Sequence, residues 1–517
     1  MAVYNTMPYL TACLDSLVGQ SIGADRMEVI AVDDGSTDGS EAELDRYAEA
    51  YPDVVTVLRQ PNSGGPAGPS NRALDVATGR YVYFVGADDY LGLEALERMV
   101  AAADEYGSDV LIGKMEGVNG RIVQPQMFVA NEPDIDLHDS HLPWVLSNCK
   151  LFRRDLVERH KLRFPEDMRI GSDQPFTIEA CVRAERISVL GDYTCYYAVL
   201  REDGGNITQG SVEIYTRLEC AEHLFAFVAQ LLEPGPRRDA IVHRHAKWEL
   251  TKPVRESLLE LDPAAQRDVC ARVGALVDRH VTDEVLGLLP IKRRVRLRLA
   301  QHGQVDRLCA AIRDDAAERA YPIMLKEGRA YFAYHGFEDP ELALPDGLYE
   351  ITKGMRRRLT EEARTVEARR NGDTLQITVR TPFVGPDRED PAVARLTATP
   401  HGGTEAALEP AQHRLPGEQG MELIAEVSLE RLAAACRNGR SRYGLKLALS
   451  AGDETYEVAV PTSVPPLREL VWYRNRPYRL TVSGDKRRRT VIDFAAVRPT
   501  RAVARRIRRV TSQLGGK

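Results

Sequence analysis

The sequence predicts an α/β fold with a mainly parallel sheet, followed by a helical segment and a β-sandwich-like domain. Three observations indicate this order: residues 1–210 alternate strand and helix patterns, residues 211–335 are helical with few turn signals, and residues 336–465 contain short alternating strands. A chain of 517 residues is also too long for one ordinary domain. We therefore expect four parts, the last of them a basic C-terminal tail at residues 466–517.

Short runs of β-branched and aromatic residues within the first part alternate with amphipathic helical patterns. Runs of four to eight such residues bounded by Gly, Asn or Asp are typical of strands. Their alternation with helices is typical of a parallel sheet built from βαβ units. We expect strands at about 28–33, 54–58, 80–86, 109–114 and 187–199, and helices at about 8–19, 40–50, 70–77, 93–106 and 174–184.

The later segments have different patterns. Residues 365–379 contain two alternating runs on either side of Asn371-Gly372, a turn pair that strongly favours a β-hairpin. Tyr443, Leu445 and Leu447 alternate in the same way. Several such strands within residues 336–465 predict a β-sandwich.

Composition limits the class of protein. Hydrophobic residues make up 43% of the chain and charged residues 28%, as in soluble globular proteins, and no apolar run is long enough to span a bilayer. Eight cysteines lie far apart without a C-x-x-C motif, which argues against a zinc site or a disulfide framework and favours a reducing compartment. We therefore expect a cytoplasmic protein.

Two strand patterns end in paired carboxylates. The apolar run at 80–85 leads to Asp88-Asp89, and the run at 28–32 leads to Asp33-Asp34. Ligands of open α/β sheets bind at the carboxyl ends of the strands, and carboxylate oxygens are ligands for hard cations. The two pairs together predict a site for Mg²⁺ or Mn²⁺ and the diphosphate that it bridges. The alternative is that each Asp only caps the following helix.

Two further features lie near these strand ends. The loop at 62–71 is rich in glycine and proline, and its glycines would allow backbone to approach a ligand closely. The first helical pattern begins almost at Met1, so only two or three residues remain for the first strand of a βαβ unit. We expect that extending the reading frame upstream would reveal further β-branched residues of that strand.

Four motifs occur in a family-specific order: Ala2-Val-Tyr-Asn-Thr, Val32-Asp-Asp-Gly-Ser-Thr-Asp-Gly-Ser, Asn62-Ser-Gly-Gly and Ala87-Asp-Asp-Tyr-Leu. Together they resemble an inverting glycosyltransferase of family 2 with the GT-A nucleotide-sugar-binding fold, over residues 1–210. Shorter stretches, among them Arg163-Phe-Pro-Glu and Ser172-Asp-Gln, resemble the wall teichoic acid N-acetylglucosaminyltransferases. Those enzymes modify polyribitol phosphate and carry a helical linker and C-terminal β-domains that trimerise.

The resemblance implies roles for five residues. Asp33 and Asp34 match the position that accepts a hydrogen bond from the uracil ring. Asp88 matches the metal-binding acid of the D-x-D motif, where Mn²⁺ or Mg²⁺ neutralises the departing UDP. Asp173 matches the general base that takes the proton from the acceptor hydroxyl. Arg201 matches a cation that grips the diphosphate.

The same resemblance extends to other positions, and some depart from it. Gly86 stands in place of the first Asp of D-x-D, Ser172 in place of a Glu, and Ser70 in place of an Arg for which Arg72 is a substitute. Lys150 matches a family position that could contact an anionic acceptor or only cap a strand. The remaining expected contacts with the nucleotide sugar are Val3, Tyr4, Asn62 and Ala87, and those with the acceptor or the sugar are Asn119 and Arg121.

The tail suggests a location near an anionic surface. Residues 486–517 hold eleven Lys or Arg against a single acid, Asp493. Val503, Ile507 and Val510 share one side of a helical pattern and arginines the rest, which is typical of a membrane-surface helix. The alternative is a tail that only aids solubility. We therefore expect contact with the inner face of the cell membrane in addition to the cytoplasm.

The sequence leaves several functions open. The favoured one is metal-dependent, inverting transfer of a sugar, N-acetylglucosamine above others, from a UDP-sugar to a hydroxyl of an anionic cell-wall polymer such as teichoic acid. A family 2 transferase for capsule or another surface glycan, or a non-catalytic glycan-binding scaffold, are the alternatives. No nucleic acid partner is expected. The resemblance implies a homo-oligomer, with a trimer as the form to test.

Overall fold

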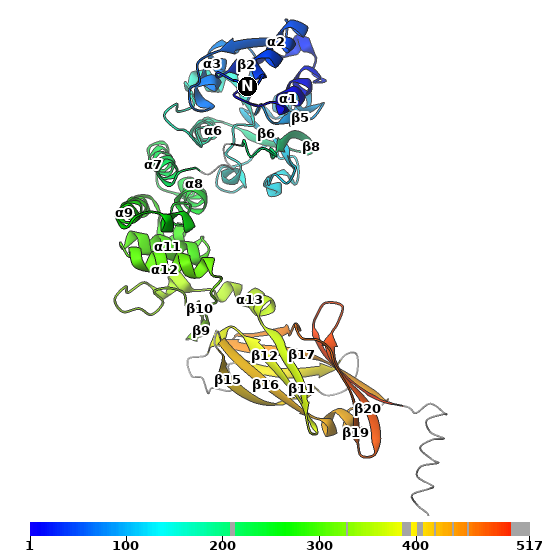
Figure 1. The fold of residues 1–517 in the computed structure, drawn as a ribbon. Helices are drawn as coiled ribbons and strands as arrows, with labels where there is room; N and C mark the ends of the chain where they lie inside the picture. The colour runs from blue at the N-terminus through cyan, green and yellow to red at the C-terminus, as the bar shows by residue number, and fades with distance from the viewer. Residues whose placement is uncertain are drawn as a thin grey trace, which may run out of the picture. The chain divides into compact units, whose positions relative to one another are not determined.

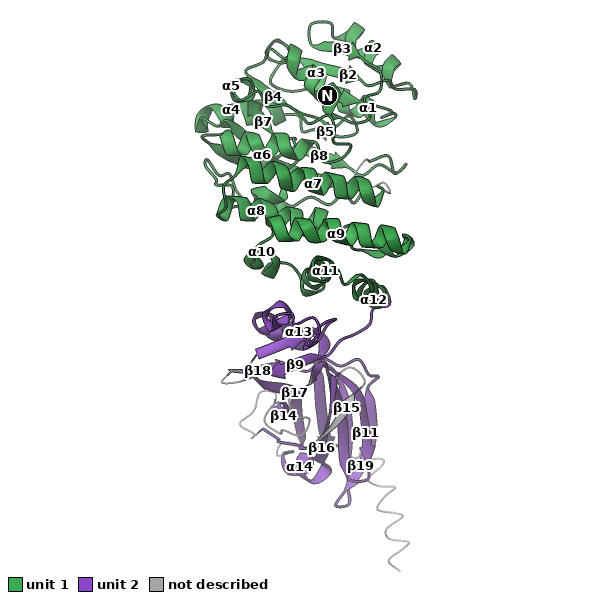
Figure 2. Ribbon diagram, turned by 90° about the vertical axis from the view of Figure 1, so that its left-hand side faces the viewer, with its two compact units in different colours: residues 1–316 green, residues 317–517 purple. Residues whose placement is uncertain are grey.

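The computed structural model describes residues 1–206, 212–326, 329–384, 394–400, 407–417, 420–436, 439–451 and 454–497. The chain divides into two compact units, Met1–Ala316 and Ala317–Lys517 (Figure 2). Each unit is described by itself. The amphipathic tail helix expected around Val503 lies outside the described residues.

The first unit begins with a parallel three-stranded sheet in the order β1-β2-β3 (Figure 1). Val3 of β1 is level with Asp33 of β2, and Asp33 is level with Arg59 of β3, so the carboxyl ends of the three strands meet at one edge. The strands are β1 Ala2–Val3, β2 Val29–Asp33 and β3 Val55–Arg59, and the helices between and after them are α1 Tyr9–Val18, α2 Ser40–Ala50 and α3 Ala67–Val76.

A second sheet, in the order β4-β7-β6-β8-β5, continues the first. Its longest pairing, β6 with β8, is parallel, whereas β4, β5 and β7 make short antiparallel pairs. A parallel bridge between Ala2 and Gly86 joins the two sheets. The strands are β4 Tyr81–Tyr83, β5 Tyr90–Leu91, β6 Val110–Val118, β7 Leu151–Arg153 and β8 Ile187–Val199, and the helices are α4 Ala95–Tyr106, α5 Arg154–Arg159 and α6 Asp173–Arg183.

One apolar core holds these sheets and helices together. Leu10, Cys13, Leu14 and Leu17 recur at helical spacing in α1, and all four are buried. They pack in a cluster that includes Met99 of α4 and residues of β2, β6 and β8. Burying a side chain of this size stabilises the fold by about 1.5–3 kcal/mol, so the helical periodicity of the sequence becomes the packing face of α1.

The rest of the first unit is helical, as the sequence predicts. Asp262 caps α9 by accepting hydrogen bonds from the backbone N–H groups of Ala264 and Ala265. None of the described helices is long and apolar enough to cross a bilayer. The helices are α7 Ile214–Leu231, α8 Pro236–His245, α9 Pro263–His280, α10 Asp283–Gly287, α11 Ile291–Gln301 and α12 Val305–Ala316.

The second unit is built on antiparallel sheets. One has the order β11-β12-β16-β15, and the other has the order β14-β17-β21-β20-β19 with β18 paired to β17. Buried and partly exposed residues alternate along β16, so this strand turns one face into the core. The strands are β11 Arg364–Asn371, β12 Thr374–Thr381, β14 Ala394–Pro400, β15 Ala411–Gly417, β16 Gly420–Ser428, β17 Arg440–Ala451, β18 Glu454–Ala459, β19 Leu467–Tyr473, β20 Arg476–Gly484 and β21 Thr490–Ala496.

Smaller elements complete the second unit. A short sheet in the order β10-β9-β13 contains one antiparallel and one parallel pairing. Its strands and the remaining helices are β9 Ile323–Lys326, β10 Arg329–Phe332, β13 Phe383–Val384, α13 Met355–Glu362 and α14 Leu429–Ala434.

The predicted architecture is confirmed: an α/β part, a helical part and antiparallel β-sheets follow one another. All five strands and all five helices expected in residues 1–210 are present, with ends shifted by a few residues. Two boundaries lie elsewhere than the sequence suggests. The strands β9 and β10 fall within the segment assigned to helices, and β19, β20 and β21 fall within the segment assigned to the tail. Each set contains hairpins of neighbouring strands, of which the sequence suggested only one short hairpin after residue 465, and each joins a larger sheet through one distant pairing, β9 with β13 and β21 with β17.

Candidate active site

The pair Asp88-Asp89 follows β4, where the buried side chains of Val82, Phe84 and Val85 anchor the end of the strand. The Asp88 carboxylate accepts a hydrogen bond from Nδ2 of Asn206 at 3.0 Å. Asp89 accepts one from the Tyr196 hydroxyl and one from the backbone N–H of Val199 at 2.6 Å. Both oxygens of Asp89 are thus occupied, and Asp88 retains one oxygen without a partner among the described residues.

The pKa of both acids in the pair is raised. Burial raises the pKa of Asp88, and the charges of Arg201 and Arg121 oppose this effect. Burial and then the charge of Asp88 raise the pKa of Asp89 to about 6. A cation beside Asp88 would favour the ionised form of both acids. Binding of a cation at Asp88 would therefore be favourable at this site.

Gly86 leaves space that the acid pair uses. A Cβ atom at this position would lie 2.8 Å from Oδ2 of Asp89, and 3.2 Å from both Oδ1 of Asp88 and the Tyr196 hydroxyl. The Gly86 N–H donates to the Tyr196 hydroxyl at 3.1 Å. The space beside Gly86, where the sequence resemblance implies an acid, is thus taken by Asp89 and Tyr196.

The pair Asp33-Asp34 at the end of β2 is almost fully buried. Asp34 accepts hydrogen bonds from Nε2 of Gln60 at 2.7 Å and from the N–H and hydroxyl of Ser63. Asp33 accepts one from the Ser36 N–H at 3.1 Å. Asp34 therefore holds the glycine-rich loop against the strand end, which is a role beyond the expected contact with a base.

Arg201 connects this edge of the sheet to the segment after β8. Its guanidinium donates to the Asp203 carboxylate, at 2.7 and 3.0 Å, and to the carbonyl of Asn5 at 3.2 Å. Its side chain is 8% exposed and lies over the Tyr9 ring. The Arg201 N–H also donates to Oδ1 of Asn206, the residue that bonds Asp88. A cation therefore lies where a diphosphate held at Asp88 would need one.

Asp173 is the first residue of α6. Among the described residues, none donates a hydrogen bond to its carboxylate from a side chain. Burial raises the pKa of Asp173, and the charges of Arg244 and Lys150 oppose this effect. Burial, and then the nearby charges of Asp89 and Asp173, raise the pKa of the Cys149 thiol to about 12. Asp89 and Asp173 are therefore both close enough to Cys149 for their charges to act on its thiol.

The three expected acceptor contacts differ in placement. Arg121 lies within electrostatic reach of Asp88 and Asp89. Asn119, in the same turn, has a positive φ of 55° and its amide reaches the Leu200 carbonyl. Lys150 is 1% exposed, and its ammonium donates to the carbonyls of Val145 and Ser147 at 2.5 Å. Lys150 was expected either to contact an anionic acceptor or to cap a strand. Its placement favours the structural role, because it holds the turn before β7.

The remaining expected donor contacts line the same edge. Val3 is buried, and its carbonyl accepts from the Asp34 N–H at 2.8 Å. Tyr4 is 49% exposed. Asn62 donates to the Asp34 carbonyl at 3.1 Å, and Arg72 donates to the Arg59 carbonyl at 2.5 Å. Ala87 is buried beside Asp88.

Several residues of the site were missed from the sequence. Asn206 and Tyr196 bond Asp88 and Asp89 from more than a hundred residues away. Asn71 joins α3 to the segment before α6 through its bonds to Phe164 and Glu166. Arg244 of α8 bonds Gln174, next to Asp173. These contacts form only when strands pair and helices pack. Asn71 is the one residue with a local signal, because it follows Ser70, which departs from the family pattern.

Two segments of the first unit match models of known protein families. Residues 1–161 match the family described as Glycosyl transferase family 2, and residues 219–312 match the Glycosyl transferase TarS linker domain. A solved structure of residues 1–349 of Staphylococcus aureus TarS in complex with UDP-GlcNAc is 30% identical, with a TM-score of 0.57 over 65% of this chain and 95% of that one. The chain belongs to glycosyltransferase family 2.

Curated relatives of this family 2 chain act on polyribitol phosphate. Poly(ribitol-phosphate) beta-glucosyltransferase of Bacillus spizizenii is 44% identical over 200 residues, or 39% of this chain and 32% of that protein. Poly(ribitol-phosphate) beta-N-acetylglucosaminyltransferase TarS of Staphylococcus aureus is 42% identical over 199 residues, or 38% and 35%. The chain thus matches about a third of the length of these relatives.

A more complete crystal structure of S. aureus TarS resembles the family 2 chain beyond its first unit. It is 24% identical with a TM-score of 0.59, and the match covers 97% of this chain and 85% of that one. At this identity the likeness concerns the fold. It supports the order of an α/β part, a helical part and C-terminal β-sheets.

Proposed function

We propose that this chain transfers a sugar from a UDP-sugar to a hydroxyl group of an anionic cell-wall polymer, with inversion at the anomeric carbon. The observation that carries the proposal is the Asp173 carboxylate: no side chain in the described part of the chain donates a hydrogen bond to it, and its charge, like that of Asp89, acts on the Cys149 thiol. One free base opposite a donor site is what a single displacement requires.

Asp173 is the general base in this mechanism. As the acceptor hydroxyl oxygen bonds to the anomeric carbon, its proton passes to Asp173 and the bond to the UDP oxygen breaks with its electron pair. Burial raises the pKa of Asp173, and the neighbouring charges of Arg244 and Lys150 limit that rise and so favour its ionised form. No second acid is needed because the leaving diphosphate is already a weak base.

The donor is held at the carboxyl ends of β1, β2 and β4. Arg201, fixed by Asn5 and Asp203, stabilises the diphosphate by charge-assisted hydrogen bonds. Asp33, Asn62 and Arg72 are the proposed contacts of the uridine half.

A divalent cation fits the donor side of the site. No group of three metal-ligating side chains occurs among the described residues. Mg²⁺ and Mn²⁺ nevertheless commonly take one carboxylate together with substrate phosphates and water. Asp88 offers one unbonded oxygen of that kind, so Asp88 would hold the ion, which neutralises the charge that develops on the departing diphosphate.

The relatives support the choice of substrates. The names of the two curated relatives give glucose and N-acetylglucosamine as the sugar and poly(ribitol phosphate) as the acceptor. The solved structure of TarS residues 1–349 holds UDP-GlcNAc. The two matches are of similar strength, and we take N-acetylglucosamine as the first candidate sugar because of the solved complex with UDP-GlcNAc, with glucose as the second.

Product analysis tests this proposal. The full chain is incubated with Mn²⁺, poly(ribitol phosphate) and either UDP-GlcNAc or UDP-glucose, and the polymer is examined by mass spectrometry and NMR. We expect a β-linked sugar on the polymer from one donor. Transfer to a capsular glycan alone would favour the surface-glycan alternative, and an absence of both transfer and UDP release with every donor would favour a non-catalytic scaffold.

We further propose that the second unit assembles copies of the chain rather than taking part in the chemistry. Strand β19 lies at the edge of its sheet and exposes Leu470 and Trp472, each 60% exposed, on the same side. Exposed edges with apolar side chains pair readily with other strands. A homo-oligomer, with a trimer as the form to test, would cover them. Contact with the inner face of the membrane, through the basic tail, is part of the same proposal.

A further inference from the structure

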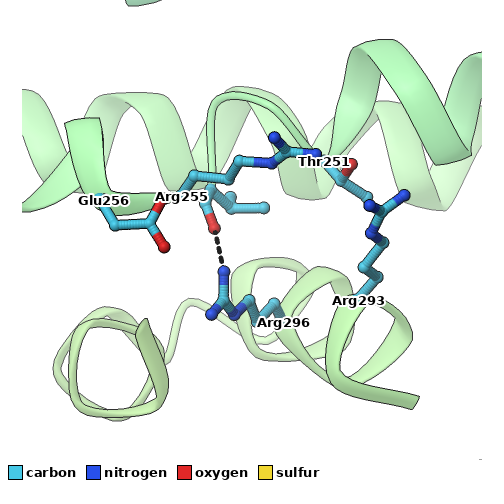
Figure 3. A pocket seen from close by; sticks show the side chains of 6 residues that line it. Thr251, Arg255, Glu256, Arg293 and Arg296 are labelled. Carbon is cyan, nitrogen blue, oxygen red and sulfur yellow. Dashed lines mark hydrogen bonds between the residues drawn. The ribbon is translucent and has the colours of Figure 1, made fainter. Parts of the chain in front are cut away.

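A cavity in the helical part of the first unit is lined mainly by arginine side chains. It has a volume of about 220 Å³ and is bounded by Thr251, Val254, Arg255, Glu256, Arg293 and Arg296. Figure 3 shows that Arg255 approaches from the segment after α8 and that Arg293 and Arg296 approach from α11. The guanidinium groups of Arg255 and Arg293 lie on either side of Thr251.

The helix α11 supplies an unusual concentration of charge. Its sequence, Ile-Lys-Arg-Arg-Val-Arg-Leu-Arg-Leu-Ala-Gln, holds five cations and no acid, in a chain whose net charge is −7. Most of these charges are used within the fold: Lys292 and Arg296 pair with Asp315, and Arg298 pairs with Asp283. Arg293 faces the cavity and does not join these pairs.

Two of the lining arginines lack a counter-ion. Within the described ranges, no carboxylate forms an ion pair with Arg255 or with Arg293. Arg293 donates only to the carbonyl of Lys247, at 3.1 Å. Partial burial and then the charges of Arg255 and Arg296 lower the pKa of Arg293. Arg255 and Arg293 therefore repel each other and Arg296, and among the described groups only the Asp315 partner of Arg296 and the Glu256 carboxylate at the cavity edge offset this charge.

The third arginine gives the cavity a fixed wall. Arg296 is 11% exposed, and it is held by the Asp315 carboxylate at 2.5 Å and by the Val254 carbonyl at 3.2 Å. Its Nε is buried without a hydrogen-bond partner in the part of the chain that the structure describes. Thr251 is also fixed, since its hydroxyl donates to the Lys247 carbonyl. The wall is thus set by the fold and not by flexible surface side chains.

The alternative to an anion-binding site is that these arginines belong to an ordinary solvent-exposed surface. A solvated face would place its charges apart and pair them along the helix, as Arg298 is paired with Asp283. Here the two guanidinium groups that lack an ion pair among the described residues converge on one open pocket from separate segments of the chain. Guanidinium groups are suited to the oxygens of a phosphate, which they bind through paired hydrogen bonds.

We propose that the cavity lined by Arg255, Arg293 and Arg296 binds a phosphodiester group of the anionic polymer, at a place separate from the acid pair and Asp173. The inference rests on the proposed function only for the identity of the polymer. A second contact of this kind would hold a long acceptor while one of its hydroxyl groups is used at Asp173. Short acceptors would not reach it.

Direct binding tests the proposal without any transfer reaction. Binding of unglycosylated poly(ribitol phosphate) to the full chain, in the absence of donor, is measured by calorimetry at several salt concentrations. The variant Arg255→Gln/Arg293→Gln should raise the Kd on the order of tenfold. The slope of log Kd against log salt concentration should also fall by about one to two, because two fewer cations contact the phosphates. Arg255→Lys/Arg293→Lys should restore part of the affinity, since it keeps the charge but not the paired geometry.

The matched control is Arg267→Gln/Arg279→Gln, which removes two exposed charges from α9. It should leave Kd within about twofold of the unchanged chain. Thermal unfolding should show that the cavity variant is at least as stable as the unchanged chain, because it removes repulsion between like charges. An equal loss of affinity in both double variants, or in neither, would overturn the proposal.

Further measurements distinguish the polymer from free phosphate and from a lipid headgroup as the ligand of the cavity. Inorganic phosphate should displace the polymer from the unchanged chain more strongly than sodium chloride does at the same ionic strength. Binding to phosphatidylglycerol vesicles that is lost in Arg255→Gln/Arg293→Gln, without any binding of the polymer, would assign the cavity to a lipid headgroup and overturn the proposal. A chain that binds the polymer through the cavity but forms no product contradicts only the proposed function. A chain that forms product with unchanged polymer affinity in the variant contradicts only this inference.

Discussion

The acid pair after β4 and the arginines around the cavity beside α11 both gather like charges in partly buried places, but they differ in how the chain treats those charges. Asp89 accepts hydrogen bonds from Tyr196 and Val199, and Asp88 accepts one from Asn206. Arg255 has no such partner among the described residues, and Arg293 has a single carbonyl. The acids are held in fixed positions by hydrogen bonds of the fold, whereas the two arginines have no ion pair among the described residues and, on our proposal, take an anionic ligand.

This difference separates two kinds of defect. Changes at the acid pair and at Asp173 should act on turnover, because in the proposed mechanism these groups contact the reacting atoms or hold those that do. Changes at the arginine end should act on the affinity for a long acceptor and leave turnover at saturation unchanged. The predictions below test this separation, from the largest expected effect to the smallest.

Replacing Asp173 should have the largest effect. Asp173→Asn keeps the shape of the side chain but cannot take the proton, so kcat should fall by a factor on the order of 10² or more. The Kd for UDP-GlcNAc should not change. Transfer assays and calorimetry measure the two quantities, with Asp167→Asn, an exposed acid in the preceding loop, as the control. Near-normal turnover in Asp173→Asn would exclude the assignment.

Asp88 should be required for the metal dependence of the reaction. A chelator should abolish activity, and Asp88→Ala should cause a comparable loss that added Mn²⁺ does not reverse, since one oxygen ligand is gone. A titration with Mn²⁺ in both proteins measures this. Undiminished turnover in the presence of EDTA would show that Asp88 has another use.

Gly86 should tolerate no side chain. Gly86→Ala places a Cβ atom 2.8 Å from Oδ2 of Asp89, so the acid pair and Tyr196 must move apart. Small displacements of catalytic groups are costly, and kcat/KM should fall by roughly tenfold. Gly287→Ala, where a Cβ atom would meet nothing within 4 Å, is the matched control. Equal kinetics of the two variants would mean that the pair is less constrained than its contacts suggest.

The pH profile should depend on Arg244. Burial raises the pKa of Asp173, and the positive charge of Arg244 opposes this by favouring the ionised form. Because Asp173 must be ionised to act as a base, kcat is lost as pH falls through its raised pKa. Arg244→Gln should raise that pKa further, so the acid limb of the profile should move to higher pH while the rate at alkaline pH is retained. Arg238→Gln, on the same helix, should leave the limb in place; an unmoved limb in both would contradict the role of Arg244.

The smallest kinetic effect is expected from the second unit. Leu470→Ser/Trp472→Ser removes the exposed apolar side chains of β19, so it should dissociate an oligomer without changing the rate per active site for a short acceptor. Analytical ultracentrifugation and transfer assays measure the two quantities. If the unchanged chain already sediments as a monomer, the assembly proposal is wrong.

The sequence identified those parts of the site that follow strand or helix ends. Asp33 and Asp88 each stand at a boundary between a strand pattern and a turn, so a local pattern places them, whereas Asp173 was singled out by the family resemblance. Lys150 shows the limit of this approach. Its position in the sequence allowed a contact with an anionic acceptor, but the fold buries it and directs it to two backbone carbonyls.

What the sequence determined by itself is the order and kind of the elements, because periods of two and 3.6 residues specify which face of each element is buried. The tertiary structure decided which distant residues meet. Asn206 reaches Asp88, Arg244 reaches Gln174, and Arg255 faces Arg293 only after strands pair and helices pack. Hydrogen bonds and charge interactions act over a few ångströms in space, irrespective of separation along the chain, and no local pattern records them.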